Sequence, residues 1–487
     1  MLHDVVIIGS GFGGLGHAIN LRRAGIADVV ILEKATQVGG TWRENRYPGC
    51  RCDVPSALYS FSFAPNPEWS NTYSFRGEIW QYLDKVARDF NVLPQIRFDH
   101  AVTDARWVDD RWVLQTNHGP VEARCFIMAG GFLMEPRRPD IEGIDSFAGQ
   151  LVHTATWPDD LDLTDKKVAV IGTGASAVQA IPHIADDATQ LDVYQRTAAW
   201  ILPHSGHPTR PFTRRLFKLI PGAAKLVRGW VYLTRELLVL AFVRQPERMT
   251  RGEEQSREFI AQEIADPALR EKLTPTYRMG CKRVMISNDY LRTFTRPNVE
   301  LVTDGIARVT PTGIVSRDGT ARDYDVIVMA TGFMVADNPL AEIIYGRDGI
   351  TLAAAYRGEI DHLYGTSVPG FPNMYVVTGP NTALGHSSMV FMMESQYPYI
   401  TQSIEVALEK KAAVEPTPDA ARAWTQTVRD KLPSTVWGAG CQSWYLNDQG
   451  VNTITWPGFT FEYRRAIASY KPVDHVVAPS PHHVATH

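Results

Sequence analysis

Two residues of opposite charge follow two glycine-rich turns at the same spacing, one charged residue behind each turn. The first turn reads Gly9-Ser10-Gly11-Phe12-Gly13-Gly14, and Glu33 lies 19 residues beyond it. The second reads Gly172-Thr173-Gly174-Ala175-Ser176-Ala177, and Arg196 lies 19 residues beyond it. A carboxylate at this position accepts hydrogen bonds from a ribose 2′-hydroxyl, whereas a guanidinium pairs with a 2′-phosphate. The two turns therefore predict two different dinucleotide sites.

Each turn stands where a strand gives way to a helix, which is the setting that such a site needs. Apolar runs at 5–8 and 167–171 precede the turns, and helix-like segments follow them. In the first copy Gly9 permits the tight turn, Gly11 lets a pyrophosphate approach the backbone, and Gly14 lets helix and strand pack closely. The helix N-terminus adds N–H groups that favour phosphate. We expect FAD at the first turn and NADPH at the second, so that a hydride passes from nicotinamide to flavin.

The repeated pattern also predicts the fold class and the domain organisation. We expect an α/β protein with two Rossmann-like dinucleotide-binding domains, the second inserted in the first. The FAD-binding domain is predicted at 1–140 and 325–470, because strand-like segments of similar composition end near 128 and near 330. The NADPH-binding domain is predicted at 150–324, with a helical insertion at about 205–275. Residues 471–487 lack periodicity, and we expect them to form a loose tail.

The composition argues against several other classes of protein. With 49 Lys and Arg against 53 Asp and Glu, the formal net charge is −4, so no nucleic-acid partner is expected. The five cysteines, at 50, 52, 125, 281 and 441, form no cluster with metal-ligand spacing, so we expect no metal site and free thiols in a reducing compartment. The N-terminus lacks a signal-peptide pattern, and no apolar run is long enough to span a bilayer. A cytoplasmic protein is predicted.

Three further segments carry a family resemblance. Residues 147–158, "FAGQLVHTATWP", place Phe147, Gly149, His153, Trp157 and Pro158 in the pattern FxGxxxHxxxWP. Residues 39–53, "GGTWRENRYPGCRCD", follow the pattern GGxWxxxxYPGxxxD, and "GCKR" stands at 280–283. Together these segments resemble the motifs of the Baeyer–Villiger monooxygenases, the class B flavoprotein monooxygenases. The resemblance covers nearly the whole chain.

This resemblance implies an NADPH- and O₂-dependent reaction. NADPH would reduce FAD, O₂ would add to the flavin C4a carbon, and the resulting peroxyflavin would insert one oxygen atom next to a ketone carbonyl. Arg283 would stabilise the negative charge that develops on the peroxide and on the adduct, and Asp53 would hold this arginine. Lys282 would assist Arg196 and Thr197 at the 2′-phosphate. The substrate would be a small lipophilic carbonyl compound, although the same species, when protonated, oxygenates sulfur or nitrogen.

The resemblance also adds cofactor contacts. Those to FAD would include Gly40, Thr41, Trp42, Asp53, Tyr59, Val102 and Met389. Those to NADPH would include Gln179, Arg283 and Trp444, although the segment around Trp444 departs from the family pattern. Phe147, Gly149, His153 and Trp157 would couple cofactor binding to domain movement.

The residues alone leave other interpretations open. Lys282 and Arg283 point to opposite faces if their segment is extended, but the residues alone favour two exposed basic residues in a loop. His153 fits a structural histidine, and His386 fits an incidental loop residue. Cys50 and Cys52 raise the alternative of an FAD/NADPH disulfide reductase, although one intervening residue is tight for a redox pair. An N- or S-oxygenase and a non-catalytic NADPH-binding protein are further alternatives.

Residues 210–243 stand apart because apolar residues recur there at helical spacing with basic residues between them. Leu226, Trp230, Leu233 and Leu237 share one helical face. We expect a helical insertion packed on its own core. The alternative is a basic amphipathic surface that touches a membrane or admits a lipophilic substrate. The sequence leaves the substrate and the oligomeric state open.

Overall fold

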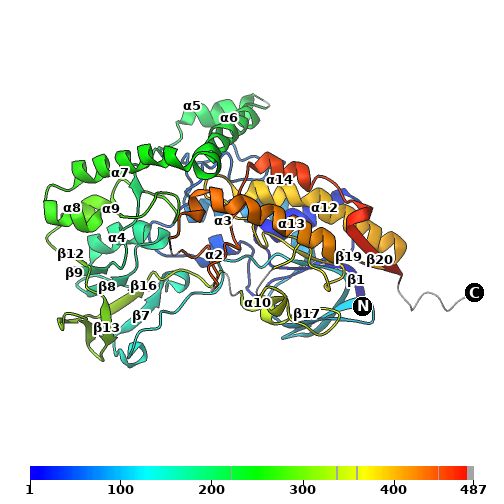
Figure 1. Cartoon of the computed structure of the whole chain (residues 1–487), viewed down its shortest axis with the longest axis horizontal. Helices are drawn as coiled ribbons and strands as arrows, with labels where there is room; N and C mark the ends of the chain where they lie inside the picture. The colour runs from blue at the N-terminus through cyan, green and yellow to red at the C-terminus, as the bar shows by residue number, and fades with distance from the viewer. Residues whose placement is uncertain (221, 336–337, 358–359, 442, 448, 480–487) are drawn as a thin grey trace, which may run out of the picture.

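The computed structural model describes residues 1–220, 222–335, 338–357, 360–441, 443–447 and 449–479. Two sheets built largely of parallel strands dominate the molecule, one around β1 and one around β8, at opposite sides of Figure 1. The predicted α/β class with two dinucleotide-binding folds is confirmed.

The first sheet contains the N-terminal cradle. Its order is β17 (Ile344–Tyr345), β4 (Val102–Val108), β5 (Arg111–Thr116), β6 (Gly119–Met128), β1 (Leu2–Ile8), β2 (Val29–Leu32) and β3 (Ile96–Arg97), and β18 (Met374–Val376) also pairs with β6. Val5, Val6 and Ile7 of β1 have no exposed surface. This continuous burial is typical of a central parallel strand covered on both faces.

The second sheet is wholly parallel. Its order is β12 (Val299–Val302), β9 (Gln190–Tyr194), β8 (Lys167–Ile171), β16 (Val326–Met329) and β7 (Gln150–His153). The predicted return to the first domain at residue 325 is therefore too early, because β16 pairs with β8 and β7. The chain leaves this sheet only after Met329.

Smaller sheets complete the strand set. They pair β10 (Ile201–Leu202) with β11 (Met285–Ile286), β19 (Ala412–Pro416) with β20 (His475–Pro479), and β14 (Gly313–Ser316) with both β13 (Ile306–Val309) and β15 (Ala321–Asp323). The expectation of a loose tail from 471 is wrong for its first part, because β20 forms an antiparallel ladder with β19. Residues 480–487 lie outside the described chain.

Helices cover the sheets and form the predicted insertion. Those that pack around the first sheet or follow it are α1 (Phe12–Arg23), α2 (Thr41–Glu44), α3 (Arg76–Asp89), α10 (Pro339–Glu342), α11 (Leu352–Ala355), α12 (Met389–Lys410), α13 (Pro418–Lys431) and α14 (Thr460–Ala466). Those of the second part are α4 (Ala175–Asp187), α5 (Pro211–Leu219), α6 (Ala223–Leu237), α7 (Met249–Glu263), α8 (Pro267–Leu273) and α9 (Tyr290–Thr293). Within the residues described, no helix combines the length and the apolar character needed to cross a bilayer.

The helices of the insertion differ from the expectation of a separate packed core. No side chain of α5 is buried, and Glu236 is the only buried residue of α6. The pair α5–α6 projects from the top of the molecule in Figure 1. Leu226, Trp230, Leu233 and Leu237 of α6 are therefore exposed, whereas Val231 and Tyr232 pack against the hydrophobic core.

Candidate active site

The first glycine-rich turn has the geometry of a phosphate cradle at the N-terminus of α1. Gly9 has φ +95°, and a Cβ built on it would lie 2.7 Å from the Ala129 carbonyl oxygen. A Cβ on Gly14 would lie 1.8 Å from the Gly9 carbonyl oxygen. Gly11 faces only the backbone of Gly40, at 3.6 Å. The first and third glycines thus serve chain packing, and the second leaves the backbone open to a ligand.

Glu33 is held rigidly at the end of β2. Its carboxylate accepts hydrogen bonds from the backbone N–H of Ser10 at 2.9 Å, from the Ser10 hydroxyl at 2.7 Å and from the N–H of Ala35 at 3.0 Å. Arg43 forms an ion pair with it at 3.3 Å. Sequence reasoning did not identify Arg43, because nothing in its local pattern signals a partner ten residues earlier.

The other residues predicted to contact FAD come from four places. Thr41 and Trp42 begin α2, and the Trp42 indole N–H donates to the Tyr59 hydroxyl at 3.2 Å. The Tyr59 ring packs against Phe12 of the cradle, with ring centroids 5.2 Å apart. Val102 begins β4 and Met389 begins α12, whose N-terminus is capped by Ser388. The structure therefore brings Phe12, Trp42 and Tyr59 together.

The second cradle shows a clearer opening. Gly172 has φ +117°, and a Cβ on it would lie 2.5 Å from the Ala330 carbonyl oxygen. Gly174 is the N-cap residue of α4. A Cβ built on it would meet no heavy atom within 4 Å. The fold itself thus tolerates a side chain at Gly174. A pyrophosphate that approaches the helix N-terminus explains why glycine suits this position.

Arg196 and Lys282 form a cationic pair beside this cradle. Arg196 is exposed just after β9, and Thr173 fixes the adjoining loop by donating to the Thr197 carbonyl at 2.9 Å. Burial lowers the pKa of Lys282, and the positive charge of Arg196 lowers it further. No carboxylate in the described part of the chain forms an ion pair with either residue. Two cations without an acidic partner fit a 2′-phosphate.

Arg283 pairs with Asp53 from the other domain. The Arg283 Nε–H donates to Asp53 Oδ2 at 2.7 Å, and Nη2 contacts the same oxygen. The negative charge of Asp53 raises the pKa of Arg283. The two side chains remain 29% and 27% exposed, so the pair is held in place yet accessible. Residues 280–283 form a turn rather than a strand, but Lys282 and Arg283 still diverge, one toward Arg196 and the other toward Asp53.

Gln179 connects the two cradle regions. Its side-chain oxygen accepts from the Tyr47 hydroxyl at 3.0 Å and from the Arg51 N–H at 3.2 Å, and its side-chain N–H donates to the Arg51 carbonyl at 3.1 Å. These bonds tie α4 to the segment that carries Asp53. A contact of Gln179 with NADPH stays a prediction.

The FxGxxxHxxxWP segment lies where the two domains meet. His153 ends β7, its Nδ1 accepts from the Ala155 N–H at 3.0 Å, and its Nε2 lies 3.3 Å from the Thr331 hydroxyl. Burial lowers the pKa of His153 to about 4, so the ring is neutral near pH 7. Gly149 is required because a Cβ would lie 2.4 Å from the Asp325 carbonyl oxygen, and the Phe147 ring covers it. Trp157 lines a cleft with Arg46 and Ile184, one from each domain.

Comparisons with known proteins agree with this geometry. The chain is 45% identical to a Baeyer–Villiger monooxygenase of Streptomyces coelicolor, over 98% of this chain and 93% of that protein. It is 40% identical to a Baeyer–Villiger monooxygenase of Pseudomonas aeruginosa, over 94% and 88% of the two chains. The chain belongs to the Baeyer–Villiger monooxygenase family. The predicted resemblance is confirmed.

Solved structures and a family model extend the comparison. A crystal structure of OTEMO in complex with FAD and NADP is 29% identical, with a TM-score of 0.88, and covers 98% of this chain and 99% of its own. An oxidised steroid monooxygenase bound to NADP is 33% identical, with a TM-score of 0.85 and the same coverage. The family model for pyridine nucleotide-disulphide oxidoreductases matches residues 6–218, which hold both cradles.

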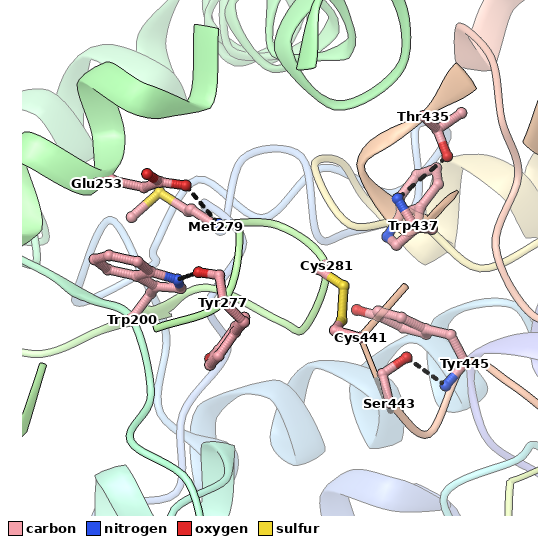
Figure 2. Close-up of a disulfide and its surroundings, with 10 residues drawn as sticks. All are labelled: Trp200, Glu253, Tyr277, Met279, Cys281, Thr435, Trp437, Cys441, Ser443 and Tyr445. Atoms are coloured by element: carbon pink, nitrogen blue, oxygen red, sulfur yellow. Dashed lines mark hydrogen bonds between the residues drawn. A yellow bond between two sulfur atoms is a disulfide. The ribbon is translucent and has the colours of Figure 1, made fainter. Parts of the chain in front are cut away.

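This monooxygenase contains a disulfide that the sequence analysis did not predict. Cys281 and Cys441 are bonded, with their Cα atoms 6.3 Å apart, so the expectation of five free thiols is wrong for these two. The bond joins the turn before Lys282 to the loop that carries Ser443 and Tyr445 (Figure 2). The partners are 160 residues apart, and no local pattern pairs them.

Tyr445 is a second residue that sequence reasoning missed, next to the predicted Trp444. Burial raises the pKa of the Tyr445 hydroxyl, and the nearby positive charge of Arg283 opposes this rise. The Trp444 ring packs on Tyr445 with centroids 4.4 Å apart and is exposed on its other side. Tyr445 therefore faces Arg283, whereas a contact of Trp444 with NADPH stays a prediction.

Cys50 and Cys52 do not have the properties of a redox pair. Both are buried free thiols. Burial raises the pKa of Cys50 to about 11 and raises that of Cys52 as well. Little thiolate forms near neutral pH, and the thiolate is the reactive species in disulfide exchange. This argues against the disulfide-reductase alternative.

His386 is more enclosed than an incidental loop histidine. Its side chain has no exposed surface, and neither ring nitrogen has a hydrogen-bond partner among the residues described. The Glu236 carboxylate lies 3.8 Å from Nε2, and the Phe242 ring packs nearby. His386 thus lies at the inner end of α6, where the insertion meets the first domain.

Proposed function

We propose that this chain uses NADPH and O₂ to insert one oxygen atom next to the carbonyl group of a small lipophilic ketone, which gives an ester or a lactone. The observation that carries the proposal is the pair of Arg283 and Asp53, which joins the two cradle-bearing domains. FAD, once reduced by NADPH, supplies the reaction with O₂ that delivers the oxygen atom.

Each protein group has a role that follows from its position. The Arg283 guanidinium stabilises negative charge that develops during oxygen insertion, because a preorganised cation in a partly enclosed site needs little reorganisation. Asp53 keeps this guanidinium oriented through its bond to Nε. Arg196 and Lys282 bind the 2′-phosphate and select NADPH over NADH. Glu33 binds the ribose 2′-hydroxyl of FAD at the first cradle.

Sulfur or nitrogen oxygenation would use the same residues, so the products decide between the two reactions. Contact of residues 210–243 with a membrane would bring lipophilic ketones to this enzyme.

The test is product analysis with purified holoenzyme, O₂ and a panel of ketones, thioethers and amines. We expect a yellow protein that consumes NADPH faster than NADH and converts ketones to esters or lactones. Arg283→Ala should lose the ester product and keep FAD. Arg278→Ala is the matched control, because this arginine lies in the same segment but pairs with Glu253. Oxidation of thioethers or amines alone would overturn the ketone assignment, and a flavin-free protein would overturn the whole proposal.

A further inference from the structure

We propose that the helical pair α5–α6 is a monotopic docking surface for anionic membranes. Among the described residues, nineteen large hydrophobic side chains are exposed, and nine of them lie between 212 and 238. Phe212 is 75% exposed, Leu226 78% and Trp230 68%. Exposed hydrophobic side chains are usually scattered singly over a protein surface, whereas here they cluster on two adjacent helices. Such a cluster indicates an interaction site.

The apolar face of α6 is fixed in its outward position by polar contacts on the opposite face. Arg228 donates to the carbonyl oxygens of Ala57, Leu58 and Ser60, and its second terminal nitrogen pairs with Glu394 at 3.2 Å. At the penultimate residue of α6, Glu236 accepts from the Thr460 hydroxyl at 2.6 Å.

The apolar residues of α6 therefore cannot turn inward without breaking these bonds. Leu226, Trp230, Leu233 and Leu237 follow the spacing of four, three and four residues that keeps them on one face. This face is the exposed one, whereas the inward face carries Arg228 and Glu236 together with Tyr232, whose ring stacks on Phe391 with centroids 4.7 Å apart. A helix in this orientation is stabilised when an apolar environment covers its exposed face.

The charge of the segment identifies what covers it. Between residues 210 and 244 the basic residues are Arg210, Arg214, Arg215, Lys218, Lys225, Arg228, Arg235 and Arg244, and the single acidic residue is the buried Glu236. The segment has a formal net charge of +7, although the whole chain carries −4. Three of its cations pair with carboxylates elsewhere in the chain, Lys218 with Glu68, Arg228 with Glu394 and Arg244 with Glu462. Among the described residues, the other five have no carboxylate partner; they are Arg210, Arg214, Arg215, Lys225 and Arg235. Apolar side chains rimmed by cations fit an anionic lipid surface.

A second copy of the chain fits less well. Two such faces brought together would place their basic rims against each other, with no exposed acidic residue in the segment to compensate. A helix that crosses the bilayer is also unsuitable, because the 15 residues of α6 span about 22 Å against a hydrocarbon core of about 30 Å. The helices therefore lie in the interface, where Trp230 suits the boundary between lipid and water.

The docking surface is continuous with the candidate active site. The π-helical turn Leu240–Arg244 follows α6, and its Phe242 ring lies 3.3 Å from a Cβ built on Gly280. Gly280 begins the turn that carries Lys282 and Arg283. A membrane-bound α6 thus places this turn close to the compartment in which a lipophilic ketone concentrates.

The test is co-sedimentation of the holoenzyme with vesicles, followed by FAD absorbance and NADPH oxidation of the same samples. We expect binding to vesicles of phosphatidylglycerol and phosphatidylcholine, and weaker binding to phosphatidylcholine alone. Raising the salt concentration from about 0.05 to about 0.5 M should weaken binding to the anionic vesicles. The variant Leu226→Gln/Trp230→Gln/Leu233→Gln and the variant Arg215→Glu/Lys225→Glu should each bind at least about 10-fold more weakly.

The matched control is Ile350→Gln/Val473→Gln, which removes two exposed apolar side chains elsewhere and should bind like the wild type. All variants should keep FAD and NADPH oxidation, since these side chains lie outside the cofactor sites. No wild-type binding to anionic vesicles would overturn the proposal, as would an apolar variant that binds normally. A wild-type dimer that the apolar variant converts to a monomer, without vesicle binding, would show that a second copy is the true occupant. Membrane binding is scored independently of turnover, so its failure leaves the oxygenation proposal intact.

Discussion

The ion pair of Arg283 with Asp53 allows a quantitative prediction for the variant Asp53→Asn. Two unit charges about 4 Å apart interact by about 4 kcal/mol at an effective dielectric constant of about 20. Both side chains are more than a quarter exposed, so we reduce this energy by half, to about 2 kcal/mol. If the full amount orients Arg283 for oxygen insertion, its loss slows that step about 30-fold. Arg283→Ala should cost more, about 100- to 1000-fold, because the stabilising charge itself is gone.

The assay is the amount of ester formed per NADPH consumed, because it separates oxygen insertion from flavin reduction. Both variants should keep consuming NADPH and release hydrogen peroxide in place of product. The control is Glu263→Gln, which neutralises the carboxylate of an exposed pair with Arg292 and should leave the product yield unchanged.

Non-additivity gives the sharper check of this reasoning. Asp53 is a positioning residue that acts through the guanidinium, so Asp53→Asn should add little on the background of Arg283→Ala. Independent, additive losses would show that Asp53 acts on its own. A product yield for Asp53→Asn within about twofold of the wild type would refute the estimate.

Three other predictions follow from the cradle, the disulfide and the buried histidines. Gly174→Ala should keep FAD and the melting temperature but raise the KM for NADPH about 10-fold or more. Gly172→Ala should instead lower the melting temperature, because of these two glycines only Gly172 would place a Cβ against the backbone. An unchanged KM for Gly174→Ala would contradict a phosphate at that position. The double variant Cys281→Ser/Cys441→Ser should melt at a lower temperature, since a bond across 160 residues restrains the unfolded chain by about 3–5 kcal/mol, and melting curves with and without reductant check this. Burial lowers the pKa of both His17 and His362 from 6.5 to about 4. Between these two pH values the unfolded chain therefore binds more protons than the folded one. The free energy of unfolding should fall as the pH falls, by about 1.4 kcal/mol per pH unit for each histidine. Denaturant unfolding at about pH 5 and about pH 7 measures this slope, and His362→Gln should reduce it by one proton; an unchanged slope would refute the assignment.

Most of the two cradles could be predicted from the sequence because their rules are local. A turn glycine, a helix N-terminus and a charged residue at a fixed interval depend on contacts within about 30 residues. Glu33 directly follows β2 as expected, whereas β9 ends at Tyr194, two residues before Arg196, and the same reasoning missed Arg43 beside Glu33.

The domain boundary and the disulfide were mispredicted for the same physical reason. Each depends on a partner far away in the sequence, and the local residues do not distinguish that partner from others. The segment 326–329 is a fully buried apolar strand that suits a central position in either sheet, and only its pairing with β8 and β7 assigns it. Cys281 and Cys441 likewise carry no local mark of each other. Tyr445 lies beside Arg283, and this disulfide joins its loop to the segment that carries Arg283.

Helix α6 shows most clearly what a periodic pattern determines and what it does not. The spacing of Leu226, Trp230 and Leu233 predicts a helix with one apolar face, and such a helix forms. Periodicity alone does not decide whether that face points to the protein or away from it, because the decision depends on the surface that receives the helix. Here the receiving surface offers the Glu394 carboxylate, 166 residues from Arg228, and the hydroxyl and N–H of Thr460, 224 residues from Glu236. Since these groups are themselves buried or nearly so, leaving them unpaired would cost more than leaving leucines in water. The face that carries Arg228 and Glu236 therefore packs inward together with Tyr232, and the face of Leu226, Trp230 and Leu233 stays exposed and available to a membrane.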